Sequence, residues 1–127
     1  MANNEKEKAK ELAERIAKER GFPRLWRNLL AERDPEFMQI LHNATMHFLY
    51  KRNSLPRKFK EIIIIVLDAI TSYEEGLRIH VRNALEAGAT EDEILEALEI
   101  CSLISVHNLS VPLLALVEEV REYEKRA

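Results

Sequence analysis

The stretch LPRKFKEIIIIVLDAI, from Leu55 to Ile70, decides the fold class. Its central aliphatic run, residues 62–67, would suit a β-strand by propensity. Pro56, however, is placed to begin a helix, and the charged turn after it runs into the aliphatic residues without any turn signal. We therefore predict a helix that is apolar on every side, and such a helix is buried on every side. In a chain this small, helices of a neighbouring subunit would have to cover part of it, so the run indicates an oligomer.

Helical patterns also precede this stretch. Residues 5–20 carry an apolar stripe built largely of alanine, which predicts a helix on the outside of the protein or against another subunit. Gly21 ends that helix, and Pro23 suits the first turn of a short second one. Asp34 can cap a third helix, in which Pro35 is the first residue.

Three more helices are predicted after it. Gly88 ends a helix over residues 74–87, and Thr90 with Glu93 forms a capping box that opens the next. We expect that helix to close at His107-Asn108 and a last helix to begin at Val111-Pro112. Strand signals are weak throughout, so the prediction is an all-α bundle of about six helices that is oligomeric.

The composition is that of one compact domain over residues 1–127. The net charge is −3 with cations and anions interspersed, which argues against a nucleic-acid partner. No apolar run approaches the roughly 20 residues that a membrane-spanning helix needs, and no signal-like segment stands at the start. A cytoplasmic protein without a membrane partner is therefore expected. Cys101 is the single cysteine, so neither a disulfide within one subunit nor a CxxC redox centre can form.

Two acids stand out in the aliphatic helix, Glu61 and Asp68. Their seven-residue separation places them on one face, about 10 Å apart along the helix axis. A carboxylate in apolar surroundings is costly unless it is paired, and its pKa tends toward values useful for proton transfer. The structural alternatives are that Glu61 lies in the first turn, where the helix dipole favours it, and that Asp68 bonds a nearby capping amide.

Four histidines complete the list of groups that could move a proton near neutral pH. His80 lies among apolar residues in mid-helix and is either a general acid–base or a hydrogen-bonded core histidine. His107 either complements a helix C-terminus or joins His80 in one pocket. His42 and His47 are interpreted as interfacial or surface residues. No histidine pair has the spacing of a helical metal site and no glycine-rich phosphate loop is present, so neither metal nor cofactor is expected.

The segment from Leu55 to Ile94, with its Gly88-Ala89-Thr90 step followed by acids, resembles the carboxymuconolactone decarboxylase family and its alkylhydroperoxidase-D-like relatives. Pro112 also fits. The resemblance covers about residues 35–120 and leaves residues 5–33 as peripheral helices. It implies an all-α fold that associates as homotrimers or homohexamers, with active sites near subunit contacts.

In the peroxidase branch of this family, a glutamate and a histidine flank a CxxC pair. Glu61 and His80 match those two positions here, whereas the cysteine positions fall on Tyr73 and Gly76. Thiol–disulfide exchange needs an attacking and a resolving thiol, so peroxidase chemistry is disfavoured.

The decarboxylase branch needs no cysteines, and the resemblance to it implies an acid–base lyase acting on a small anionic lactone. On that model, His80 donates the proton and Glu61 orients it or relays the proton. Substrate contacts would come from Arg78 and Arg82, which suit a carboxylate, and from Asp68, Tyr73 and His107. The alternative is a non-catalytic oligomer that binds a small ligand or serves a structural role on the same scaffold.

Overall fold

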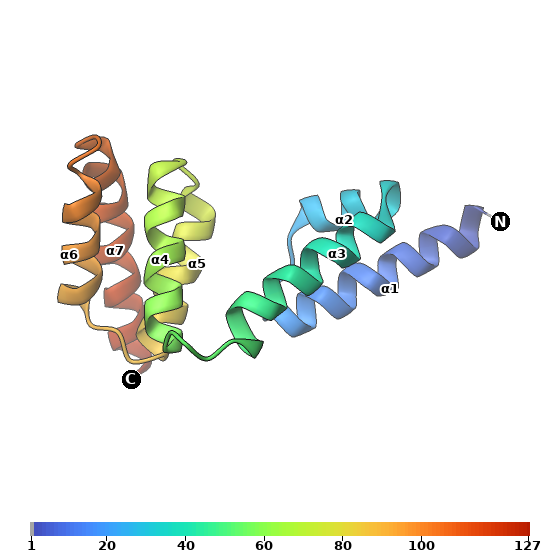
Figure 1. Ribbon diagram of the computed structural model, residues 1–127, viewed down its shortest axis with the longest axis horizontal. Coiled ribbons are helices and arrows are strands. Elements are labelled where there is room, and N and C mark those ends of the chain that lie inside the picture. Colours follow the sequence, from blue (N-terminus) through green and yellow to red (C-terminus); the bar gives the residue numbers. More distant parts are fainter. Residues whose placement is uncertain (1) are drawn as a thin grey trace. The chain divides into compact units, whose positions relative to one another are not determined.

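The computed structural model describes residues 2–127, and in that range every regular element is a helix (Figure 1). Seven are α-helices, where the sequence predicted about six, and one is a short π-helix. The all-α prediction is thus confirmed. The chain divides between Arg52 and Asn53 into two compact units. Whether the two units form the single domain predicted for residues 1–127 depends on how they associate, so that prediction stays a prediction.

The N-terminal unit packs three α-helices around a small core of alanine and a few larger side chains. In chain order its elements are α1 (Ala2–Arg20), α2 (Leu25–Arg33), α3 (Pro35–Met46) and the π-helix η1 (His47–Lys51). Gly21 adopts a φ of 88° at the end of α1, a conformation that glycine alone adopts cheaply. The Asp34 carboxylate accepts a hydrogen bond from the Phe37 amide and caps α3, as predicted.

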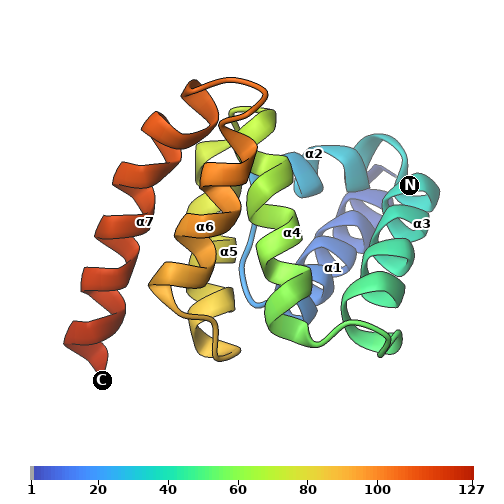
Figure 2. The ribbon, with the colours of Figure 1, turned by 60° about the vertical axis from the view of Figure 1, so that its left-hand side comes forward.

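The C-terminal unit is a four-helix arrangement with the larger core. Its helices are α4 (Arg57–Ile70), α5 (Glu74–Glu86), α6 (Glu91–Cys101) and α7 (His107–Arg126). Figures 1 and 2 show α4 beside α5 and α6 beside α7. The core is formed by inward-facing aliphatic residues of all four helices, among them Ile65, Leu77, Val81, Ile94, Leu98 and Leu116. The predicted capping box at the start of α6 is present with both of its hydrogen bonds.

The aliphatic run of α4 is helical, as its flanks predicted, but it is not buried all round within one chain. Ile65 is completely buried, whereas Ile63 and Leu67 are 46% and 55% exposed. Phe59 and Ile70 continue the exposed side of the same helix. One apolar face of α4 is therefore left uncovered by the rest of its own unit.

The boundary between α6 and α7 differs from the prediction. The helix α6 ends at Cys101, and His107 begins α7 instead of closing the helix before it. Asn108 donates from its side chain to the carbonyl of Cys101, while Ser105 accepts from the amide of His107. These hydrogen bonds satisfy backbone groups at the end of α6 and at the start of α7. Pro112 therefore falls inside α7 and does not open it.

None of the helices in residues 2–127 has the length and apolar character that crossing a membrane requires.

Candidate active site

The centre of the candidate site is a buried hydrogen bond between α4 and α5. The Nδ1 of His80 lies 2.7 Å from Oε2 of Glu61. Glu61 is completely buried and His80 is 7% exposed. The structure thus brings together the two residues that the sequence singled out as an acid–base pair, although they are nineteen positions apart.

Arg57 holds the other side of the carboxylate. Its Nε and Nη2 both lie 2.7 Å from Oε1 of Glu61, one turn further along α4. Two charge-assisted contacts thus converge on one oxygen of the carboxylate and help to balance its charge. Sequence reasoning missed this residue, although the i, i+4 spacing of Arg57 and Glu61 is a signal that could have found it.

The partners of Glu61 keep it ionised. Burial alone would raise the pKa of this carboxyl, but the hydrogen bond from His80 and the positive charges of His80 and Arg57 outweigh burial and hold its pKa below the usual value. An ionised carboxylate can only accept, so Nδ1 of His80 must carry the proton in this bond. Among residues 2–127, no second hydrogen bond engages the Nε2 of His80.

The structural alternative for Glu61 is wrong. The helix α4 begins at Arg57 and has no acidic residue in its first turn, so the dipole at the helix start does not account for Glu61. The charge of this carboxylate is instead balanced by its two specific partners.

Arg78 and Arg82, expected to meet a substrate carboxylate, are held by acids of α7. Arg78 pairs with Glu118 at 2.7 Å and with Glu74 at 3.0 Å. Arg82 pairs with the buried Glu119 at 2.6 Å. Sequence reasoning missed Glu118 and Glu119, because they lie 40 and 37 positions away along the chain. A substrate carboxylate at either arginine would have to displace or share an existing partner.

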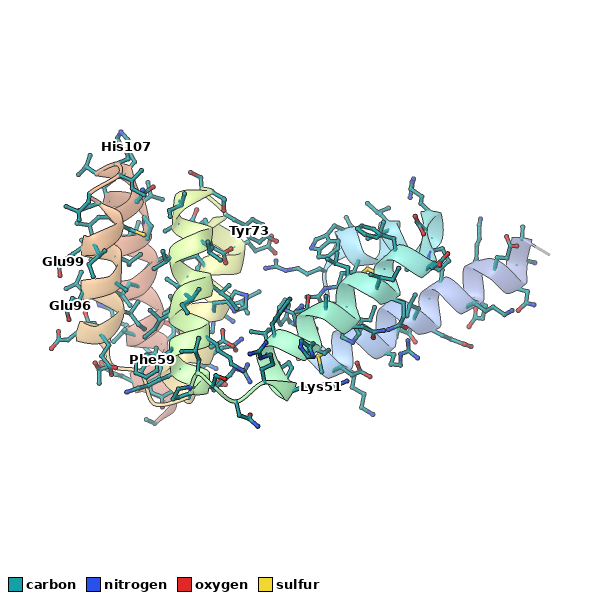
Figure 3. The ribbon with its side chains drawn as sticks, in the orientation of Figure 1. Lys51, Phe59, Tyr73, Glu96, Glu99 and His107 are labelled. Carbon is teal, nitrogen blue, oxygen red and sulfur yellow. The ribbon has the colours of Figure 1, made fainter. Side chains whose placement is uncertain are left out.

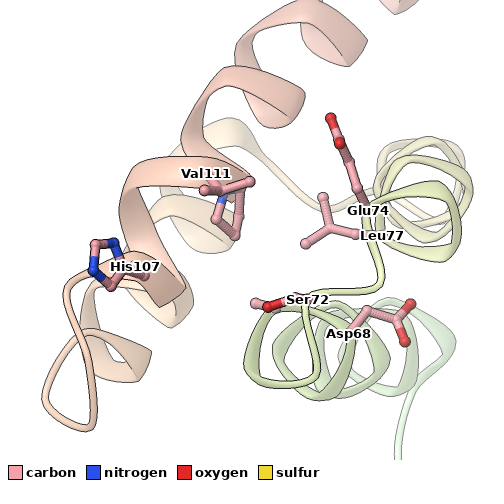
Figure 4. Close-up of a pocket in the computed structure, with 8 residues that line it drawn as sticks. Asp68, Ser72, Glu74, Leu77, His107 and Val111 are labelled. Carbon is pink, nitrogen blue, oxygen red and sulfur yellow. The ribbon is translucent and has the colours of Figure 1, made fainter.

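Asp68 and His107 lie elsewhere in the same unit, on the wall of a separate pocket. They line a pocket of about 80 Å³ together with Ser72, Glu74 and the Val111-Pro112 step. Figure 4 shows His107 at the start of α7, across the pocket from Asp68 and Ser72. Neither Glu61 nor His80 lines this pocket. Because His107 begins a helix, the prediction that it complements a helix C-terminus is wrong.

Tyr73 and Gly76 occupy the positions at which the peroxidase branch of the family has its two cysteines, and the Tyr73 ring packs against Gly76. Tyr73 stands at the turn between α4 and α5 (Figure 3). A Cβ atom built on Gly76 would overlap the Tyr73 ring and lie 2.8 Å from Oδ2 of Asp68. The space that a side chain at position 76 would need is thus already filled by the tyrosine.

The remaining thiol gives no sign of reactivity. Cys101 is 4% exposed at the end of α6, and its Sγ lies 3.9 Å from the carbonyl of Val66. Burial raises the pKa of this thiol, which keeps it in the unreactive protonated form. Within residues 2–127, no group of three or more histidine, cysteine or carboxylate side chains is arranged to hold a metal ion.

Taken together, the fold and this site define an all-helical protein with an ionised glutamate buried against a histidine and an arginine. The family model of the carboxymuconolactone decarboxylase family matches residues 35–106, more than half of the sequence. The chain belongs to that family.

Two relatives give the scale of the likeness. A 4-carboxymuconolactone decarboxylase of Acinetobacter baylyi is 29% identical over 89 residues, which are 67% of this chain and 66% of that protein. The matched region is thus just under two thirds of the relative's length. A crystal structure from Burkholderia xenovorans LB400, of a protein provisionally assigned as a carboxymuconolactone decarboxylase, superposes with a TM-score of 0.79 at 25% identity. That match covers 99% of this chain and 96% of the other.

Proposed function

We propose that this chain is a cysteine-independent acid–base enzyme, a decarboxylase or related carbon–carbon lyase acting on a small anionic lactone. The observation that carries the proposal is the 2.7 Å bond from Nδ1 of His80 to the ionised, fully buried Glu61. It fixes the ring orientation of His80 and holds a proton on Nδ1, so the protonated ring would present Nε2–H to a substrate. The 4-carboxymuconolactone decarboxylase activity of the Acinetobacter relative supports this class of reaction.

In the proposed reaction, the bond between the substrate carbon and its carboxylate breaks, and carbon dioxide leaves. The electron pair of that bond stays on the substrate as a conjugated carbanion. Nε2–H of His80 then gives its proton to that carbon, and solvent later restores the proton to the imidazole. Throughout, Glu61 stabilises the protonated ring and keeps it in place, while Arg57 holds Glu61.

Substrate contacts remain part of the proposal. Arg78 and Arg82 flank His80 in sequence on α5, and either could bind a carboxylate by exchanging a glutamate partner. Asp68, Tyr73 and His107 are proposed as further contacts.

The second candidate is a non-catalytic oligomer that binds a small ligand or has a structural role. The size of the pocket beside Asp68 and His107 favours the structural role. At about 80 Å³ it is well below the roughly 300–1,000 Å³ typical of ligand sites.

We also propose that the functional form is a homotrimer or homohexamer. The support is the uncovered apolar face of α4, formed by Phe59, Ile63, Leu67 and Ile70, each of which is at least 41% exposed. Exposed apolar surface of this kind is typical of protein–protein contacts.

The test is a screen of carboxylated lactones for release of carbon dioxide, using the wild-type protein and His80→Gln. We expect turnover by the wild type and a loss of at least about 100-fold in the variant, since general acid catalysis contributes that much or more. His47→Gln, an exposed histidine on η1, is the matched control and should retain full activity. Unchanged turnover in His80→Gln would refute the assignment. A folded wild-type protein that binds a lactone without turning it over would favour the non-catalytic candidate.

A further inference from the structure

The N-terminal unit contains a second histidine–glutamate pair, which neither the sequence nor the family resemblance indicated. Nε2 of His42 on α3 lies 2.5 Å from Oε2 of Glu19 on α1. The hydrogen bond from His42 is the main reason that the pKa of Glu19 lies below its usual value. Glu19 is therefore the acceptor, and Nε2 of His42 carries the proton.

The pair borders a polar pocket of about 450 Å³, a volume within the range of small-molecule sites. Its walls come from the last turns of α1 and from the second half of α3 continuing into η1. The lining residues are Arg15, Glu19, Gln39, His42, Asn43, Met46 and Lys51. All of them belong to the N-terminal unit.

Each side-chain acceptor group of this wall already takes part in one hydrogen bond. Arg15 donates to Oε1 of Gln39, and Nε2 of Gln39 donates to Oδ1 of Asn43 at 2.8 Å. Glu19, the one carboxylate of the lining, receives the proton of His42. The unengaged donors of the wall are the rest of the Arg15 guanidinium, the Asn43 amide N–H and the Lys51 ammonium.

The local structure around the pocket is unusual in two ways. His42 is 3% exposed, and its Nδ1 is buried without a hydrogen-bond partner among residues 2–127. A buried polar atom in that state is costly, because it has lost its hydrogen bond to water without replacing it. The π-helix η1 directly continues α3, with the Arg52 amide bonded to the carbonyl of His47, and it carries Lys51 at its end (Figure 3). Short π-helical turns are rare and are frequent at functional sites.

We propose that this pocket binds a small organic carboxylate. A carboxylate accepts from these unengaged donors, and it meets two cationic side chains, Arg15 and Lys51, against the single negative charge of Glu19. Lys51 has no carboxylate within ion-pair distance in the described chain, so its charge is available to a ligand. The site is a separate one from Glu61–His80, and it stands whether or not that pair is catalytic.

The test follows the ring signals of His42 by NMR in the full-length protein while benzoate or succinate is added. We expect a saturable shift of the His42 signals with a dissociation constant of about 1 mM, the affinity of a few exposed polar contacts. Lys51→Gln and Arg15→Gln should each weaken binding roughly 10-fold, since each removes a charge-assisted contact to the carboxylate. Lys18→Gln, an exposed lysine of α1 outside the lining, is the charge-matched control and should leave binding unchanged.

Several outcomes would overturn the proposal. One is the absence of any saturable shift of His42 with both carboxylates. Equal weakening by Lys18→Gln would indicate unspecific attraction to surface charge. If Lys51→Gln instead changes the molecular mass in solution, with no effect of added carboxylate, the pocket receives an acidic side chain of a second copy and no small ligand.

Discussion

Among single residues, Glu61 is the one that joins the two other groups of the candidate site, His80 and Arg57. One of its oxygens receives the His80 ring and the other receives Arg57, and no part of it reaches solvent. Replacing it by glutamine removes the charge that both partners need. We expect Glu61→Gln to lower the free energy of unfolding at neutral pH by about 2 kcal/mol, as measured by urea denaturation.

The same residue predicts a pH dependence. Because the pKa of Glu61 is lower in the folded state, the unfolded chain takes up this proton first as the pH falls. The stabilisation from Glu61 is therefore complete above the usual glutamate pKa of about 4.3 and is lost as the pH falls through the folded-state value. Acidification should thus destabilise the wild type more than Glu61→Gln, while the contributions of Glu19 and Glu93 are common to both proteins. Parallel pH profiles of the two would contradict this account.

Gly76 offers a prediction in which the sign of the effect is decisive. In a helix, alanine is normally more stable than glycine by roughly 0.5–1 kcal/mol. At position 76 the added Cβ would overlap the Tyr73 ring, so we expect Gly76→Ala to destabilise the protein by about 2 kcal/mol instead. In a Tyr73→Ala background the ring is gone and only the contact with Oδ2 of Asp68 remains, so the same change should be markedly less destabilising. A double-mutant cycle of thermal or urea unfolding measures this coupling, which would vanish if the ring simply moved aside.

Among the helices, α6 has the best-defined start. The Thr90 hydroxyl accepts a hydrogen bond from the Glu93 amide, and the Thr90 amide donates to one carboxylate oxygen of Glu93. The other oxygen of Glu93 forms an ion pair with Lys58 of α4 at 3.0 Å. Thr90→Ala should lower the free energy of unfolding by about 1 kcal/mol, the usual value of an N-cap. Ser54→Ala, at an exposed position outside any helix, is the control and should have little effect in the same denaturation assay.

Helix boundaries show which parts of this fold a sequence can predict. Gly21, Asp34, Gly88 and Thr90 act through groups within a few residues of themselves, and the structure confirms the predicted ends and caps. The boundary after Cys101 was wrong, because Asn108 reaches back seven residues to bond a carbonyl that the helical pattern does not reveal.

The candidate site was predictable to a similar extent. Glu61 and His80 were paired through the spacing that the family resemblance supplied, and Arg57 lay one turn away on the same helix. His42 and Glu19 could not be paired, since they are 23 positions apart on different helices and match no motif. Their meeting depends on tertiary packing, which propensity and spacing do not specify.

For the whole molecule, the main prediction concerns assembly. If the apolar face of α4 is a subunit contact, a charge placed within it must weaken the oligomer. Ile63→Asp and Leu67→Asp should each convert a trimer or hexamer to smaller species in sedimentation or light-scattering measurements. Glu96→Lys, on the outward side of α6 (Figure 3), is a charge-changing control and should keep the wild-type mass. A wild-type protein that is monomeric at all concentrations would contradict the proposed assembly.

The contact between Tyr73 and Gly76 also constrains how cysteines could be introduced at these positions. Two cysteines introduced at these positions would have to start with position 73, because the Tyr73 ring overlaps a Cβ atom at position 76. The opposite order passes through a strained intermediate. The tyrosine therefore sets the order in which a pair of thiols could be built into this turn.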